Sequence, residues 1–185
     1  MGEIQAGEVL ERREQTTIQG EPVQVPDAER LTHLQFRRYS GCPVCNLHLR
    51  SIVTRIGDIE GAGIREVVVF HSDADTMRQF QGQLPFAVIS DPEKKLYAEF
   101  GVEKKMSPLA AMNLRLLKTI PRAALRAPSK RKSIGIGEEK FNNPADFLIE
   151  PGGRVVAAKY GTHIADQWSV DELLELARSR TPSRV

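Results

Sequence analysis

Short apolar runs alternate with helical patterns along most of this chain. Within residues 64–70, the run Val67-Val68-Val69-Phe70 is continuously apolar, as in strands that are buried on both faces of a sheet. Other short segments are rich in strand-forming residues and are bounded by turn residues. The pattern therefore predicts strands over residues 31–38, 64–70, 84–89, 145–149 and 155–160.

Helical patterns separate these strands. After residue 45, apolar side chains recur at helical spacing until Gly61. The later helices have recognisable start signals: Ser72 with Asp75, Asp91 with Pro92, and Ser169 with Glu172. Helices that alternate with buried strands predict an α/β fold, in which helices flank both faces of a central mixed sheet. The polar residues 1–30 contain only a short hairpin signal, at Gln19-Gly20-Glu21.

Length and composition narrow the class of protein. A chain of 185 residues that is 41% hydrophobic can form one good-sized core, so a single domain over residues 1–185 is expected. No apolar run approaches the roughly 20 residues that span a bilayer, and the N-terminus shows no secretory signal. A cytoplasmic protein without a membrane span is therefore predicted.

Positive charge is concentrated in one segment. Nine lysines and arginines and no acidic residue lie between Lys104 and Lys132. This indicates a basic insertion over about residues 103–140, before the final β-hairpin. It could form a flap or loop near the site, lie on an anionic membrane surface or contact nucleic acid. Pro121 and Pro128 interrupt any long helix, and we favour the flap or loop, with no nucleic-acid partner.

The only two cysteines, Cys42 and Cys45, lie three residues apart between a predicted strand and a predicted helix. The first thiol is thus placed at a helix N-terminus, where free N–H groups and the helix dipole favour a thiolate. The second thiol, one turn later, can close a disulfide on the first. In a cytosolic chain, such spacing indicates redox or metal chemistry more than a structural disulfide.

Three interpretations of the pair stay open. The cysteines could be small, inert core residues. They could bind a metal with His48, in the pattern Cys-x-x-Cys-x-x-His, although zinc usually takes four protein ligands and the other histidines are scattered. They could form a redox couple, which we favour. We expect no metal and no cofactor.

Three stretches of the chain resemble the peroxiredoxin-like branch of the alkyl hydroperoxide reductase/thiol-specific antioxidant (AhpC/TSA) superfamily that carries a Cys-Pro-x-Cys motif. They are residues 36–45, 84–102 and 143–156. The resemblance implies a thioredoxin-like fold, with Pro144 as a cis-proline that faces the two cysteines. It also implies a peroxide or disulfide substrate, with thioredoxin or glutathione with glutaredoxin as reductant, and a homodimer is possible.

The chain departs from these families at three positions. Tyr39 stands where peroxiredoxins have a threonine, and Pro144 where they have an arginine that helps to polarise the peroxide. Phe36 stands where thioredoxins have a buried aspartate. The resemblance therefore leaves the substrate open between a peroxide and a disulfide.

In the redox interpretation, Cys42 attacks and Cys45 resolves. Either Arg37 or Arg38 should face the thiols and lower the pKa of Cys42, and we favour Arg38. Tyr39, Pro43 and Pro144 are the other expected substrate-binding residues, and Pro43 also fixes the turn between the thiols. His48 is expected on the surface and Trp168 in the packing near the last helix.

These expectations favour a thiol-dependent oxidoreductase that reduces peroxides or disulfides through Cys42 and Cys45. The alternative is a redox-sensing or partner-binding module without catalysis, which would use the basic insertion as its contact surface.

Overall fold

The computed structural model describes residues 2–102 and 142–179. The predicted basic insertion, residues 103–140, lies outside the described residues. No helix in the described ranges has both the length and the apolar character needed to cross a bilayer.

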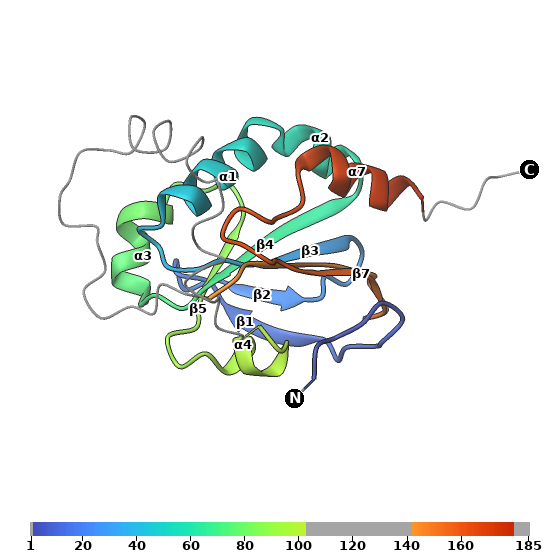
Figure 1. The fold of residues 1–185 in the computed structure, drawn as a ribbon, viewed down its shortest axis with the longest axis horizontal. Coiled ribbons are helices and arrows are strands. Elements are labelled where there is room, and N and C mark those ends of the chain that lie inside the picture. The colour runs from blue at the N-terminus through green and yellow to red at the C-terminus, as the bar shows by residue number, and fades with distance from the viewer. Residues whose placement is uncertain (1, 103–141, 180–185) are drawn as a thin grey trace, which may run out of the picture.

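A five-stranded mixed sheet forms the centre of the molecule, in the order β5-β4-β3-β6-β7 (Figure 1). Strands β3, β4 and β5 run parallel, and β6 and β7 pair antiparallel at the other side of β3. The bounds are β3 Leu31–Phe36, β4 Ile64–Phe70, β5 Ala87–Ser90, β6 Ala145–Ile149 and β7 Val155–Tyr160. The predicted mixed sheet is confirmed, and three of its five strands have the predicted bounds.

Helices cover both faces of the sheet, as predicted (Figure 1). One face is covered by α1 (Pro43–Thr54), α2 (Ile56–Gly61), α3 (Ala74–Gln81) and α7 (Val170–Arg178). The other face carries α4 (Lys95–Glu99) and a hairpin of β1 (Arg13–Thr16) and β2 (Pro22–Val25), which contains the predicted turn. The helix expected to run through to Gly61 is broken at Arg55, whose backbone leaves the helical region at φ −118° and ψ 21°.

Two predicted helix starts differ in detail from the structure. Asp73 caps α3 by accepting a hydrogen bond from the Thr76 N–H at 2.8 Å, so the predicted capping role of Ser72 is wrong. The last helix, in contrast, begins with the predicted capping box of Ser169 and Glu172. Ser72 and Asp73 lie side by side between β4 and α3, and either residue type can cap a helix. The sequence alone does not decide which one does.

The Asp91-Pro92 signal is also realised differently. Helix α4 begins four residues after Asp91, yet the Asp91 carboxylate still accepts the N–H groups of Lys95 and Leu96 at 3.0 and 2.8 Å. The carboxylate therefore satisfies the first N–H groups of the helix, although Asp91 is not its N-cap residue.

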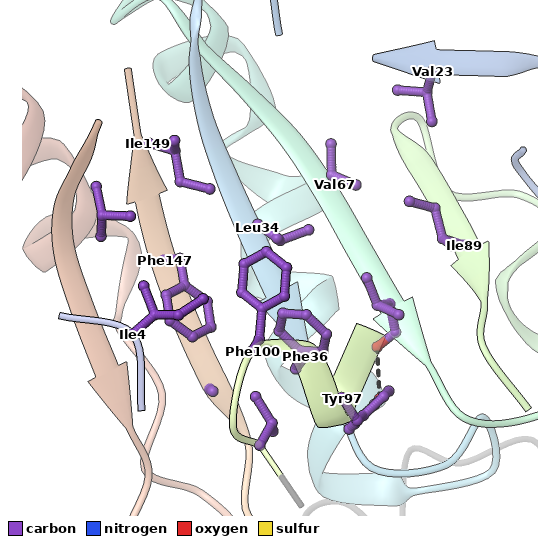
Figure 2. Close-up of a cluster of buried hydrophobic side chains, with 14 residues drawn as sticks. Ile4, Val23, Leu34, Phe36, Val67, Ile89, Tyr97, Phe100, Phe147 and Ile149 are labelled. Carbon is purple, nitrogen blue, oxygen red and sulfur yellow. Dashed lines mark hydrogen bonds between the residues drawn. The ribbon is translucent and has the colours of Figure 1, made fainter. Parts of the chain in front are cut away.

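An aromatic cluster fills the core beneath α4 (Figure 2). Phe36, Phe100 and Phe147 pack with Tyr97, and the Phe36 and Tyr97 ring centroids lie 5.0 Å apart in an edge-to-face arrangement. The buried Tyr97 hydroxyl donates to the carbonyl oxygen of Val69 at 3.1 Å and also contacts that of Arg37. Tyr97 thereby joins α4 to the strand end that leads to the cysteines.

Replacing Tyr97 with phenylalanine tests this link. The Tyr97→Phe variant keeps the ring packing but removes the hydroxyl that the buried carbonyls of Val69 and Arg37 share. We expect the free energy of unfolding in urea to fall by about 1–2 kcal/mol. An unchanged free energy of unfolding would show that the hydroxyl contributes nothing to this junction.

Candidate redox-active dithiol site

Cys42 is the N-cap residue of α1. Its backbone is extended, with φ −65° and ψ 114°, and its Sγ accepts a hydrogen bond from the Cys45 N–H at 3.4 Å. Pro43 occupies the first turn, where the missing N–H is not needed and the fixed φ already suits a helix. The Cys-Pro dipeptide therefore starts the helix for local reasons, and the sulfur atom takes the place of the usual capping oxygen.

The two sulfur atoms lie 2.8 Å apart, and both cysteines are free thiols. Both residues have an exposed fraction of 0%, whereas Pro43 between them is exposed. Apolar and aromatic side chains surround the pair, among them Tyr39 and Ile164. A disulfide between Cys42 and Cys45 needs little movement, but a reagent can contact Cys42 only when neighbouring side chains move.

A single cation lies next to the Cys42 sulfur among the described residues. The Arg38 Nη1 atom is 3.7 Å from Cys42 Sγ, and the guanidinium packs over the Tyr39 ring at 5.5 Å from its centroid. Arg37, the alternative candidate, points into a separate buried network. Arg38 is therefore positioned to stabilise a thiolate at Cys42.

The surroundings separate the two thiols electrostatically. The Cys45 S–H group donates to Cys42 Sγ and, against the effect of burial, lowers the pKa of Cys42 to about 7. The Arg38 charge and the N–H groups of Cys45 and Val44 contribute to this lowered pKa in the same direction. Burial, together with the nearby Cys42 sulfur, raises the pKa of Cys45 well above its usual value. At pH 7, about half of Cys42 is thus thiolate, whereas Cys45 keeps its proton.

Pro144 does not form the expected cis peptide. Among the described residues, the only cis bond is Val25–Pro26, so the prediction for Pro144 is wrong. The chain runs through Pro144 into β6 as an ordinary strand start, where its carbonyl accepts the Gly161 N–H at 2.8 Å and its missing N–H leaves no donor unpaired. Pro144 lines a pocket with Tyr160 and Thr162, and neither cysteine lines that pocket.

A buried polar network lies on the sheet face that α1 covers, and the sequence interpretation missed it. His33, Gln35, Arg37, Glu66 and Asp146 are all buried. The His33 ring lies 2.9 Å from Glu66 and 3.2 Å from Asp146, and Arg37 donates to Asp146 at 2.6 Å. Its signal was present in the sequence, because polar residues occupy every second position, 33, 35 and 37, of the central strand.

His48 is partly exposed and also contacts this network, so the expected surface position holds only in part. It lies one turn after Cys45 and therefore faces the sheet, with its Nε2 atom 3.3 Å from Arg37 Nη2. Burial, and then the Arg37 charge, lower the pKa of His48 to about 3. The neutral ring therefore adds no charge beside Arg37. Among the described residues, no group of three His, Cys, Asp or Glu side chains could hold a metal ion.

The network also sets the charge states of His33 and Asp146. Burial alone would lower the pKa of His33, but the Glu66 charge and the hydrogen bond to Asp146 raise it to about 9. Burial opposes the ionisation of Asp146, yet Arg37 and His33 hold its pKa far below the usual range. His33 is therefore protonated at neutral pH.

Trp168, expected in the packing near the last helix, is buried. Its ring lies beside the His33 ring, with the two centroids 5.8 Å apart.

Most of the chain matches a known protein family. A family model described as AhpC/TSA antioxidant enzyme matches residues 51–163, more than half of the chain. The chain belongs to this family. The match begins six residues after Cys45, so membership rests on the part of the chain that contains β4 to β7, and not on β3 or the cysteine motif.

Solved structures with a similar fold include several peroxiredoxins. Peroxidoxin BcpB from Mycobacterium tuberculosis is 13% identical, with a TM-score of 0.69 over 97% of this chain and 99% of that one. A mutant of PrxQ from Xylella fastidiosa is 13% identical, with a TM-score of 0.70 over 98% and 100%. A putative thiol:disulfide interchange protein DsbE from Chlorobium tepidum is 19% identical, with a TM-score of 0.59 over 94% and 99%.

At these identities the likeness shows the fold, which is the predicted thioredoxin-like fold of the AhpC/TSA family. No curated protein sequence matches the chain.

The Arg38 charge can be tested by removing it. In an Arg38→Met variant, we expect the pKa of Cys42 to rise by about one unit, because the nearest cation is lost. The thiolate absorbance at 240 nm, followed against pH, measures this. Arg50→Met removes a cation from an exposed position on α1 and should leave the Cys42 pKa unchanged. Equal shifts in both variants would show that Arg38 acts only through net charge.

The His33 network predicts a pH dependence of stability. The folded pKa of His33, about 9, exceeds the unfolded value of about 6.5. Its contribution to stability is therefore complete below pH 6.5 and is lost as the pH rises to 9. Cys42 acts in the opposite direction, because its lowered pKa adds stability as the pH rises above 7.

A Cys42→Ser variant separates the two effects. In this variant, the free energy of unfolding in urea should fall between pH 6.5 and 9 by up to about 3 kcal/mol, at about 1.4 kcal/mol for each unit of pKa shift. Adding His33→Gln should abolish the decline, whereas adding His163→Gln should preserve it. A free energy of unfolding that stays flat or increases over this range in Cys42→Ser would contradict the assignment.

Proposed function

We propose that this member of the AhpC/TSA family is a thiol-dependent oxidoreductase that cycles Cys42 and Cys45 between dithiol and disulfide. One observation carries the proposal: two adjacent sulfur atoms, 2.8 Å apart, have pKa values displaced in opposite directions. Such a pair contains a nucleophile and a neighbour that can resolve it. Two inert core cysteines would need no such difference.

With a peroxide, the Cys42 thiolate attacks one oxygen and breaks the O–O bond. Cys42 becomes a sulfenic acid, and the other oxygen leaves as an alkoxide or hydroxide that takes up a proton. The Cys45 sulfur then attacks Cys42 Sγ, and water departs with the Cys45 proton as the disulfide forms. The peroxide gains two electrons, and the dithiol loses two.

With a disulfide substrate, the Cys42 thiolate attacks one sulfur and displaces the other as a thiolate. Cys45 then attacks the mixed disulfide and releases the second thiol. Either route ends with the same intramolecular disulfide. Thioredoxin, or glutathione with glutaredoxin, would return it to the dithiol by the reverse exchange, and this requirement suits a reducing compartment such as the cytoplasm.

The names of similar structures support both substrate classes. One reports the alkyl peroxide reduction activity of the bacterioferritin comigratory protein of Xanthomonas campestris, and another is a putative thiol:disulfide interchange protein. Arg38 and Tyr39, which lie beside Cys42, are the substrate-contacting residues that we propose, together with the exposed Pro43. Pro144 is a weaker candidate, because it lines a pocket that neither cysteine lines.

Oxidation of the reduced protein tests the proposal. Hydrogen peroxide, tert-butyl hydroperoxide and oxidised glutathione would each be added while free thiols are counted and products are weighed by mass spectrometry. We expect at least one of these oxidants to react with Cys42 at least tenfold faster than with free cysteine and to leave a Cys42–Cys45 disulfide. Cys45→Ser should stop at the sulfenic acid or mixed disulfide, and Cys42→Ser should lose the fast reaction.

Failure with all three oxidants, at the rate of free cysteine or below, would exclude the proposed reductase. The dithiol would then belong to a slow redox sensor or to a binding module. Turnover is measured separately, by the oxidation of NADPH through thioredoxin and its reductase or through the glutathione and glutaredoxin system.

A further inference from the structure

The peptide unit around Ser40, two residues before Cys42, is held from three directions. The Ser40 N–H donates to the Ser72 hydroxyl oxygen at 2.8 Å. The Ser40 carbonyl accepts two side-chain amide N–H groups, from Gln81 and from Asn46, each at 2.8 Å. These partners come from α3, from α1 and from the loop after β4, so three separate segments fix one short turn.

We call the hydrogen bonds of Ser40 with Ser72, Gln81 and Asn46 the clamp, and Gln81 is its central member. It is the last residue of α3, has an exposed fraction of 0%, and also donates to the Asn46 side-chain oxygen at 2.9 Å. Its side-chain NH2 group makes both of these hydrogen bonds, whereas its Oε1 atom is buried without a partner among the described residues. Hydrogen bonds are stronger in such a desolvated place. Gln79, on the same helix, is exposed.

The clamp is linked by further hydrogen bonds to the backbone of Cys42. The Cys42 N–H donates to the Tyr39 carbonyl and the Asn46 N–H to the Cys42 carbonyl, both at 3.0 Å. The Asn46 side chain then returns to Ser40, so Cys42 lies inside a ring of hydrogen bonds. The place of Cys42 Sγ relative to the Cys45 N–H and to Arg38 depends on this backbone.

We propose that Gln81 is a positioning residue for Cys42. Through Ser40 and Asn46, it holds Cys42 as the N-cap residue of α1, with its sulfur within reach of the groups that favour the thiolate. Loss of the clamp lets the turn before Cys42 relax and weakens those interactions. The effect on the thiol stands by itself, whereas its importance for turnover rests on the proposed oxidoreductase function.

The test compares two glutamine-to-methionine variants of one helix. Gln81→Met keeps an unbranched side chain of similar length but cannot donate, and Gln79→Met is the exposed control. We expect the Cys42 pKa to rise by about one unit in Gln81→Met. The alkylation rate of Cys42 by iodoacetamide at pH 7 should then fall about fivefold, in proportion to the thiolate fraction. Gln79→Met should match the unchanged protein in both measurements.

Asn46→Ala provides a second route to the same answer, since Asn46 is only partly buried. It should raise the Cys42 pKa in the same direction, and the double variant with Gln81→Met should shift it by less than the sum of the two single shifts. If Gln81→Met does not fold, the Asn46→Ala measurement decides. A Cys42 pKa that stays within about 0.2 units in every variant that folds would overturn the proposal and leave Gln81 a purely structural residue.

These measurements need no substrate, so they are independent of the oxidation experiment. A shifted pKa in a protein that reduces none of the three oxidants would support the clamp and exclude the proposed function. An unchanged pKa in a protein that turns over would exclude the clamp alone.

Discussion

The buried guanidinium of Arg37 holds the centre of this structure together. It donates to Asp146 at 2.6 Å, to Gln35 at 2.6 Å and to the Ala145 carbonyl at 3.4 Å, so it joins β3 to β6. On the helix side it contacts His48 of α1. Burying a charge is costly unless its partners are in place, so these contacts restrict how β3, β6 and α1 can pack. The cysteine pair is carried by the helix that this packing fixes.

Arg37 and Arg38 adjoin in sequence but act on different surroundings. The Arg37 charge is opposed by Asp146 within the network, whereas Arg38 lies 3.7 Å from Cys42 Sγ. Because Asp146 offsets the charge of Arg37 within the network, Arg37 has little effect on the electrostatic potential at the thiols. Arg38 can therefore act as the local cation of the site, and the central sheet can still be held by buried charges.

The proposed chemistry depends on a difference between two identical side chains. Cys42 caps the helix and receives N–H groups, a thiol proton and a cation, whereas Cys45 is enclosed one turn further on. The position in the helix creates part of this difference. Burial and the Arg38 charge contribute the rest. Two residues far away in sequence, Gln81 and Ser72, hydrogen-bond the Ser40 backbone before Cys42. The AhpC/TSA family match begins after the motif, so the proposed thiol chemistry rests on the geometry of the site.

The sequence by itself determined the features that depend on neighbouring residues. The apolar runs gave β4, β6 and β7 their bounds, Ser169 and Glu172 capped the last helix, and Cys42-Pro43 started α1, because each needs only local backbone preferences. Only the tertiary structure decided the rest. It kept the Pro144 peptide trans, turned His48 onto Arg37 and used Ser72 to hold Ser40 instead of capping a helix. Hydrogen bonds between residues that are 11 and 32 positions apart in the chain set the last two of these outcomes, and local sequence patterns carry no information on such contacts.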